Sequence, residues 1–377
     1  MRGIHRFVLA SGLSMAASVI VAAGVAIAPA AQANTRGPFV GGFNTTTVVA
    51  STVPANGDVN PYGVAVVKDS VGKLRQGNVL VSNFNNSQNL PAGEQGRGTT
   101  IVQVSPTGKV RLFAQIDAAN LPGPCPGGVG LTTALSILNN GWVVVGSLPT
   151  SDGTSATAKA GCLLVLNSSG RVVETFAGHG INGPWDMTAL SFGSFAELFV
   201  TNVLNGTVAA NGQVVNRGTV LRLVVTTPAY GVPKRLATTT IGSGFAQKTD
   251  PAALVIGPTG VGLGKDGTLY VADSVNSAID AIPGATYRFT SAGTGRPVSS
   301  GGALNGPLGL AIAPGGDILT VNSGDGNLVE TTPAGNQVAV KTVNSAGAGA
   351  LFGLAVAPYG AGIYLVDDAL NNLDLFH

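Results

Sequence analysis

Internal repetition is the feature that most constrains how this 377-residue chain can fold. A Pro-x-Gly or related start is followed by a short apolar strand, a turn, and a second strand of β-branched and aromatic residues that ends in Asn or Asp. The starts lie about 45 to 75 residues apart, a spacing typical of repeated supersecondary units. Clear copies begin at Pro61, Pro184, Pro258, Pro307 and Leu351, and a weaker copy begins at Gly128.

Each copy is followed by a third strand, and all copies but the last are followed by a fourth. Residues 100–104 and 162–166 are examples of the third strand. Asn140-Gly141 and Asp266-Gly267 are hairpin-turn signals between strands. Short antiparallel four-strand units at this spacing are typical of propeller blades. The sequence therefore predicts an all-β fold, a six-bladed β-propeller.

The sixth copy lacks a fourth strand, because the sequence stops at His377 directly after the third. Near the other end, residues 45–51 form a β-branched segment that belongs to none of the copies. We expect this N-terminal segment to be the outer strand of the sixth blade and so to close the ring. Closure would remove the open sheet edges at which such sheets aggregate.

The first 33 residues have the pattern of a secretory signal peptide. Arg2 and Arg6 precede a long apolar run, and a small-x-small cleavage pattern ends at Ala33. An uncleaved N-terminal anchor is the alternative, because the run is long enough to span a bilayer. We expect residues 34–377 to form a single domain that is exported to the periplasm, the cell surface or the medium.

Charged residues are scarce, at 10% of the chain, where soluble domains carry about 25%. Propeller blades pack on their neighbours through both sheet faces, which leaves few positions for charge. The chain has 20 Lys and Arg against 18 Asp and Glu, and removal of the signal peptide leaves 18 against 18. This balance predicts no electrostatic signature of nucleic-acid or anionic-membrane binding.

Cys125 and Cys162 are the only two cysteines. Two cysteines exclude a multi-cysteine zinc or iron–sulfur site. In an exported protein they can form a disulfide, and closing the loop between them would stabilise the fold by roughly 4 kcal/mol in the chain-entropy picture.

The strand ends Leu269–Asp273 and Ile363–Asp367, the latter followed by Asn371-Asn372, resemble the ends of NHL repeats. The chain thus resembles NHL-repeat six-bladed propellers over nearly its whole length after the signal peptide. The resemblance implies the regucalcin and strictosidine-synthase-like superfamily, which includes calcium-dependent lactonases, peptidylglycine lyases and pure binding modules. These motifs are specific for architecture and do not determine an activity.

Four long polar loops predict where binding takes place. We call the face at which the first strand of each blade begins the start face, and the opposite one the end face. The long loops at residues 84–98, 148–160, 203–217 and 274–284 all belong to the start face. Long loops above a rigid scaffold are where binding residues usually lie.

The residue inside each Pro-x-Gly motif should lie near the mouth of the central channel on this start face. This ring is aromatic and apolar, and it either plugs the channel or forms the floor of a small-molecule pocket. In regucalcin-type lactonases, the resemblance implies Asn or Asp metal ligands at this kind of position, and this sequence has none there. The ring consists of Tyr62, Val129, Trp185, Thr259, Leu308 and Phe352.

The last residue of most second strands has an oxygen-bearing side chain, and these residues form a second ring. Because Ca²⁺ prefers oxygen ligands, this ring keeps calcium as a possible cofactor. In propellers such residues more often bind the backbone of the following loop. The ring consists of Asn83, Asn202, Asp273, Asn322 and Asp367.

Asp186 replaces the motif glycine in the third copy and follows Trp185 directly. His179 lies seven residues upstream, and a His and a carboxylate at one mouth could act as a general acid–base pair. The alternative is a hydrogen bond that only holds the loop. His179 and His377 are the only histidines after the signal peptide, which excludes a multi-His metal site.

These observations favour an exported binding protein that uses the start-face loops and the central mouth for a small molecule, a glycan or a protein. The alternative is a hydrolase or lyase of the lactonase or strictosidine-synthase type with Asp186 and His179 in the reaction. A structural surface module without a pocket is a third hypothesis. We expect a monomer that binds no nucleic acid and has no membrane span once the signal peptide is removed.

Overall fold

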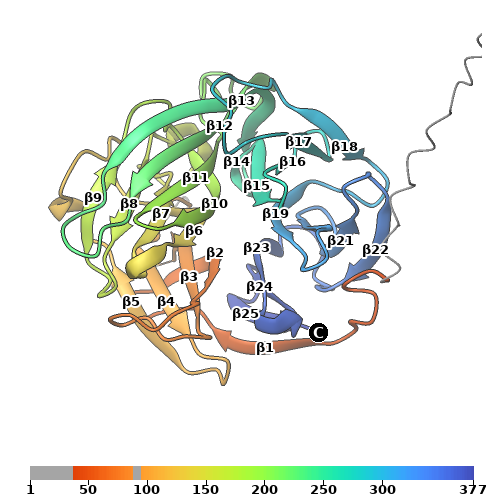
Figure 1. Ribbon diagram of the computed structural model, residues 1–377, viewed down its shortest axis with the longest axis horizontal. Helices are drawn as coiled ribbons and strands as arrows, with labels where there is room; N and C mark the ends of the chain where they lie inside the picture. The colour runs from red at the N-terminus through yellow and green to blue at the C-terminus, as the bar shows by residue number, and fades with distance from the viewer. Residues whose placement is uncertain (1–36, 88–94) are drawn as a thin grey trace, which may run out of the picture. The chain divides into compact units, whose positions relative to one another are not determined.

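The strands form six antiparallel sheets arranged around a central axis (Figure 1). The computed structural model describes residues 37–87 and 95–377, so the predicted signal peptide lies outside the described residues. The first strands of neighbouring sheets contact one another all the way round, with β2 against β6, β10 against β15 and β23 against β2 as examples. This arrangement confirms the predicted six-bladed β-propeller.

Blades 1 to 3 follow the chain order. Blade 1 contains β2 (Asp58–Val66), β3 (Val79–Asn86), β4 (Thr100–Val104) and β5 (Val110–Gln115). Blade 2 contains β6 (Leu131–Ile137), β7 (Val143–Ser147), β8 (Cys162–Leu166) and β9 (Val172–Phe176). Blade 3 has five strands, β10 (Pro184–Phe192), β11 (Phe195–Asn202), β12 (Val215–Thr226), β13 (Arg235–Asp250) and β14 (Leu254–Ile256).

Blades 4 to 6 complete the ring. Blade 4 contains β15 (Pro258–Leu263), β16 (Leu269–Asp273), β17 (Ala278–Ile282) and β18 (Arg296–Ser300). Blade 5 contains β19 (Pro307–Ile312), β20 (Ile318–Asn322), β21 (Asn327–Thr331) and β22 (Gln337–Thr342). Blade 6 contains β23 (Leu351–Val356), β24 (Ile363–Asp367), β25 (Asn372–Phe376) and β1 (Thr46–Ser51).

Helical structure in the described residues is limited to four short 3₁₀ turns in the loops. None of the helices there is long and apolar enough to cross a membrane. The turns are η1 (Ala118–Asn120), η2 (Asn139–Gly141), η3 (Ser155–Thr157) and η4 (Pro358–Gly360).

The N-terminal strand closes the ring as the sequence predicts. β1 pairs antiparallel with β25, with Thr46 opposite Phe376 and Ser51 opposite Asn372. The segment before β1 is held as well, because Glu330 accepts hydrogen bonds from the backbone N–H groups of Phe39 (2.7 Å) and Val40 (2.9 Å). Both termini of the propeller thus lie in the same blade, and β25 is not left as an open edge.

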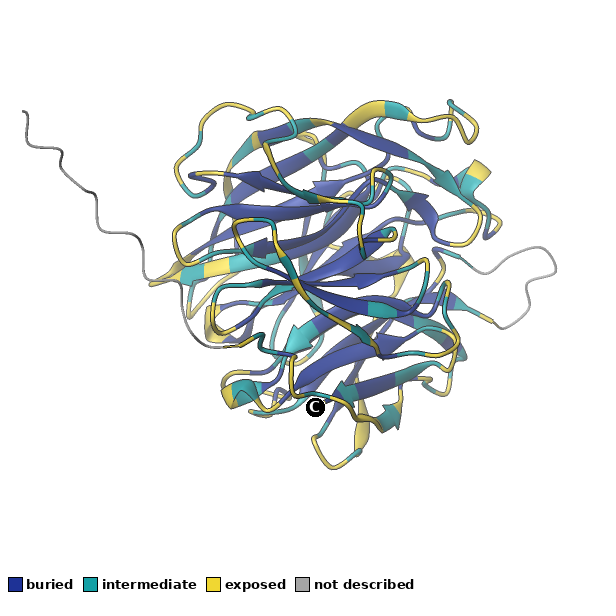
Figure 2. Ribbon diagram, turned by 90° about the vertical axis from the view of Figure 1, so that its right-hand side faces the viewer, coloured by how far each residue is buried: buried dark blue, intermediate teal, exposed yellow. Residues whose placement is uncertain are grey.

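Burial follows the position of each strand within its blade, which explains why charge is scarce. All five residues of β7 and all five of β8 are buried, whereas β22 on the outside alternates between half-buried and exposed residues. Figure 2 shows this pattern as dark inner strands and exposed turns. Only the outer strands and the loops offer positions where a charge keeps its water.

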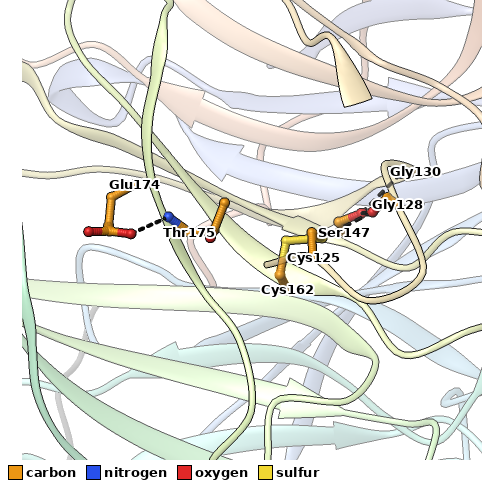
Figure 3. Close-up of a disulfide and its surroundings, with 7 residues drawn as sticks. All are labelled: Cys125, Gly128, Gly130, Ser147, Cys162, Glu174 and Thr175. Atoms are coloured by element: carbon orange, nitrogen blue, oxygen red, sulfur yellow. Dashed lines mark hydrogen bonds between the residues drawn. A yellow bond between two sulfur atoms is a disulfide. The ribbon is translucent and has the colours of Figure 1, made fainter. Parts of the chain in front are cut away.

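A disulfide joins Cys125 and Cys162, as expected from the sequence, with 5.1 Å between their Cα atoms (Figure 3). Cys162 begins β8 and is buried, while Cys125 lies in the long connection between β5 and β6. Ser147 holds the same connection, because its hydroxyl donates to the Gly128 carbonyl (2.9 Å) and accepts from the Gly130 N–H (3.0 Å). The disulfide therefore fixes a start-face connection to blade 2.

We predict that a chain beginning at Thr52 loses stability relative to one beginning at Gly37. The shorter chain lacks β1 and Val40, and Val40 is fully buried, so its burial alone contributes about 2 kcal/mol. Urea unfolding followed by circular dichroism measures the difference, with the chain from Gly37 as the matched control. Equal stability of the two chains would contradict the closing role of β1.

Candidate functional site

Aromatic side chains from three blades stack on one another at the start of the central channel. The rings of Tyr62 and Phe352 lie 4.0 Å apart at 14°, and Phe84 stacks on the other side of Tyr62 at 4.6 Å. Trp185 lies 6.3 Å from Phe352. Tyr62, Trp185 and Phe352 are each no more than 3% exposed. The predicted ring thus exists, and its aromatic members are packed against one another.

The fifth strand of blade 3 adds to this cluster. Leu254 and Val255 of β14 are fully buried in it, and the Trp185 indole N–H donates to the Val255 carbonyl (2.8 Å). Leu254 adopts the left-handed backbone conformation (φ 63°), which is uncommon for a branched residue and sets the sharp turn into β14. We call Tyr62, Phe84, Trp185, Phe352 and β14 the aromatic plug.

Two of the three remaining ring positions, Leu308 and Thr259, are also buried. Leu308 is fully buried in the same cluster. Thr259 is fully buried too, and its hydroxyl is hydrogen-bonded to the Ser274 hydroxyl (2.6 Å) and to the Pro307 carbonyl (3.1 Å). Of the two alternatives for the ring, the plug is the one that this packing fits. A ligand pocket at the start-face mouth does not agree with it.

The second copy differs from its sequence-based alignment. Leu131 pairs with Ser147 and Leu135 with Val145, so three residues, 132–134, stand where blades 3 to 6 have two. Val129 lies before β6 and packs in a separate cluster between blades 1 and 2. The placement of Val129 in the ring was therefore wrong. Gly128 and Gly130 imitate the motif, and the extra residue in β6 shifts the true inner position to residues 132–134.

A cavity of about 370 Å³ occupies the channel beyond the plug. Its walls are the later halves of all six inner strands, for example residues 64–66, 186–189 and 353–356. None of Tyr62, Trp185, Thr259, Leu308 and Phe352 is among the lining residues. Because the inner strands run from the start face to the end face, the cavity belongs to the end face. This is the opposite of the face that loop length predicts.

Asp186 is the predicted site residue that lines this cavity, and its side chain is 8% exposed. One carboxyl oxygen accepts from the Met187 N–H (2.7 Å), and the other accepts from the Val261 N–H of blade 4 (3.3 Å). Its own N–H donates to the Thr201 hydroxyl (3.0 Å). The carboxyl therefore bridges the inner strands of blades 3 and 4.

Burial raises the pKa of Asp186 from 3.8 to about 8, against the lowering effect of the hydrogen bonds from Met187 and Val261. At neutral pH the carboxyl is mostly protonated, so it can donate a hydrogen bond to an acceptor in the cavity. The Thr133 hydroxyl lines the same cavity and is buried without a partner. Buried polar atoms without partners are rare in proteins and call for an explanation.

Lys68 is the other charged residue of the lining, and it is exposed. The wall between it and Asp186 is largely aliphatic, with Val64, Leu135 and Leu354 as examples. The cavity thus combines aliphatic side chains with a lining surface that is more polar than apolar, one deep carboxyl and one exposed ammonium group.

His179 does not join Asp186 in this cavity. It is exposed in the connection between β9 and β10, adopts a left-handed conformation (φ 53°) and is absent from the lining. The structure brings Asp186 together with Lys68 and Thr133 instead, which sequence spacing alone could not indicate.

Asp186 and the lining around it do not form a calcium site. Across residues 37–87 and 95–377, no three His, Cys, Asp or Glu side chains cluster in a way that could hold a metal ion. Asp186 is one protonated carboxyl that already accepts two N–H groups, whereas Ca²⁺ takes six to eight oxygen ligands. The second ring is used locally, since Asn83 donates to the Thr52 carbonyl (3.1 Å) and Asp273 accepts from the Asn276 N–H (3.2 Å).

We predict that Trp185→Ala lowers the free energy of unfolding by about 3 to 5 kcal/mol, because it empties a packed position in the plug. Tyr62→Phe keeps the stacked ring and should cost less than about 1.5 kcal/mol. Urea unfolding of both variants measures this difference. An average substitution costs about 1 kcal/mol of stability. If Trp185→Ala lowered the free energy of unfolding by no more than that, the ring would not be a plug.

We also predict that Asp186 makes stability fall as the pH rises. The unfolded chain releases this proton near pH 4 and the folded chain near pH 8, so the folded state holds the extra proton between these values. Asp186→Asn removes this dependence, which amounts to at most about 1.4 kcal/mol per pH unit. Burial also raises the pKa of Asp280 and of Asp374 to about 6. Both residues contribute the same pH dependence of stability to the parent and to Asp186→Asn, so the difference between the two curves reports Asp186. Parallel stability curves of parent and variant from pH 4 to 8 would contradict the prediction.

Comparisons with known proteins show the fold. No protein-family model and no curated protein sequence matches the chain. A gluconolactonase from Xanthomonas campestris is 12% identical over 88% of each chain, with a TM-score of 0.51. A luciferin-regenerating enzyme is 13% identical over 88% of this chain and 94% of its own (TM-score 0.52), and the PQQ-bound aldose sugar dehydrogenase of Streptomyces coelicolor is 15% identical over 88% and 97% (TM-score 0.51). At these identities the similarity is one of fold, and the chain is a six-bladed propeller of the kind that the sequence resemblance implies.

Proposed function

We propose that this protein binds a small molecule in its central cavity, which the ligand reaches from the end face. The observation that carries the proposal is one buried, protonated carboxyl, Asp186, in a cavity of about 370 Å³. This volume lies within the range of small-molecule pockets. A pocket with an apolar wall and a few directed polar groups is the usual form of such sites.

The lining indicates the chemistry of the ligand. Aliphatic side chains beside a larger polar surface favour a carbon skeleton that carries hydrogen-bonding groups, and the protonated Asp186 favours an uncharged acceptor, such as a carbonyl or ring oxygen, at the deep end. The free Thr133 hydroxyl offers a second hydrogen bond. Lys68 at the exposed end favours a polar or anionic group there. Lactones, esters and keto compounds meet the first two requirements.

The alternative function is hydrolysis or elimination on such a ligand, with Asp186 as proton donor. It is favoured by the fold shared with a gluconolactonase and by a carboxyl whose pKa is near neutral, as general acids require. Lys68 is the only other titratable side chain of the lining, and His179 is not part of it. A water molecule would therefore have to attack the ligand without a histidine as general base.

We further propose that the protein acts outside the cytoplasm. The Cys125–Cys162 disulfide supports this proposal, because disulfides persist mainly in oxidising compartments. The N-terminal pattern that predicts a signal peptide points the same way.

We predict that Ala355→Phe, which places a ring inside the cavity, abolishes binding of a lactone or keto ligand found by thermal-shift screening. Asp186→Leu should weaken the same ligand about tenfold by removing one hydrogen bond, and Asp186→Asn should retain most of the affinity. Parent affinity should fall above pH 8, because the ionised carboxyl no longer donates. Calorimetric titration measures the affinity of the parent and of each variant.

Leu370→Ser is the matched control, because Leu370 lies in a start-face turn and is 65% exposed. Its affinity should equal that of the parent. Unchanged affinity in Ala355→Phe would overturn the proposed cavity site. If the parent turned over the lactone and Asp186→Leu did not, the catalytic alternative would replace the binding function that we propose.

A further inference from the structure

Basic side chains are concentrated on the end face of the propeller. Because neighbouring strands are antiparallel, the turns between the first and second strands and between the third and fourth strands all lie on the end face. In blade 1, the end-face turns and the adjoining strand residues carry one acidic residue, Asp69, against five exposed basic residues. These are Lys68, Lys73, Arg75, Lys109 and Arg111.

Blades 2 to 4 continue this excess on the same face. Asp266 is the only acidic residue in their end-face turns, and Asp317 is the only one in the described end-face turns of blades 5 and 6. The basic residues in these turns are exposed, except for the half-buried Arg288 and for Arg235, which packs on the Phe176 ring of blade 2 and donates to the Ala177 carbonyl (3.0 Å). Apart from Arg235, they are Arg171, Lys234, Lys265, Arg288 and Arg296.

The start face has no such excess within the described residues. Five cations there, among them Arg97, Lys159 and Arg217, are offset by five exposed or half-buried aspartates, among them Asp117 and Asp152, and three further aspartates are buried. A chain with a nearly balanced total charge therefore presents, apart from Arg235, ten exposed or half-buried cations and three acidic groups on one face. Such a face attracts anionic partners over a Debye length.

Aromatic side chains project from the same face in two adjacent blades. Tyr230, in the turn between β12 and β13, is 94% exposed, and Tyr287 and Phe289, between β17 and β18, are 71% and 82% exposed. Phe192 and Phe195 stack on each other at 6.2 Å at the tip of the β10–β11 hairpin. The Arg222 guanidinium lies 5.7 Å from the centre of the Phe289 ring, but most of the surface of these rings is exposed, so they are available to insert into a partner.

We propose that the end face of blades 3 and 4 docks on an anionic phospholipid bilayer. The cations alone would suit any polyanion, but Phe and Tyr at the tips of two turns suit the bilayer interface, where rings insert between headgroups while Lys and Arg contact phosphates. Lys234 and Arg296 flank the exposed rings in sequence and supply those contacts. Docking places the open end of the cavity at the membrane.

The proposed docking differs from the expectation drawn from composition. Net charge near zero predicted no anionic-membrane signature, but net charge is a sum over both faces. The fold gathers the excess of cations on one face, and that face is the one that the proposed docking uses.

The test measures how much of the protein beginning at Asn34 sediments together with lipid vesicles. One set of vesicles is phosphatidylcholine alone, and the other contains 30% phosphatidylglycerol. This chain contains every strand of the closed ring, and it excludes the apolar N-terminal run, which would bind lipid by itself. The parent should bind the anionic vesicles, release them in 0.5 M NaCl, and bind the neutral vesicles weakly.

Substitution of Arg171, Lys234 and Arg296 together by Gln should weaken binding to anionic vesicles about 100-fold. Tyr287→Ser with Phe289→Ser should weaken it about tenfold or more. The matched controls are Arg97, Lys159 and Arg217 together changed to Gln, and Leu370→Ser. Both controls lie on the start face and should bind as the parent does.

Equal binding to neutral and anionic vesicles, or parent affinity in the end-face Gln variant, would overturn the proposal. Heparin binding that the Gln variant loses and the double Ser variant keeps, without binding to vesicles, would assign the face to a soluble polyanion instead. Thermal unfolding of each variant checks that the propeller is intact, and the substituted side chains are all at least partly exposed.

Discussion

Backbone contact between neighbouring inner strands at the motif glycines is the constraint on which the rest of this propeller depends. A Cβ atom at Gly353 would clash with the Tyr62 carbonyl oxygen, and one at Gly309 would clash with the Phe352 carbonyl oxygen. Only glycine allows inner strands to come this close. The close approach also brings together the side chains that precede the glycines, which is why Tyr62 and Phe352 stack at 4.0 Å. The plug is thus a consequence of how the blades meet.

The third blade breaks this rule, and the candidate site lies at the break. Asp186 stands in the glycine position, so the inner strand of blade 4 cannot touch the backbone there and instead donates the Val261 N–H to the carboxyl. The plug excludes water from the start face, and burial in the channel keeps the carboxyl protonated at neutral pH. One substitution in a repeated motif therefore converts a packing contact into a polar group at the wall of a cavity.

The sequence was sufficient for features that depend on local pattern. Turn pairs such as Asp266-Gly267 and the β-branched segment at 45–51 predicted the blades and the closing strand, because strand and turn preferences act over a few residues. The prominence of Asp186 was also visible, since it interrupts a repeat. Two features escaped prediction because they depend on pairing in space. The extra residue in β6 is hidden by the glycines at 128 and 130, and β14 depends on the left-handed turn at Leu254.

The position of the cavity also escaped prediction, for a reason that applies to propellers in general. Loop length indicates where a chain tolerates insertion, whereas a cavity forms where inner side chains are small or stand apart. At the start face the ring residues are large and fill the channel, and further along Ala189, Ala311 and Ala355 leave it open. The same end carries the cationic turns and the exposed rings. The lining runs from the deep, uncharged Asp186 past aliphatic side chains to the exposed Lys68, and a ligand with an uncharged acceptor at one end and an anionic group at the other matches that order.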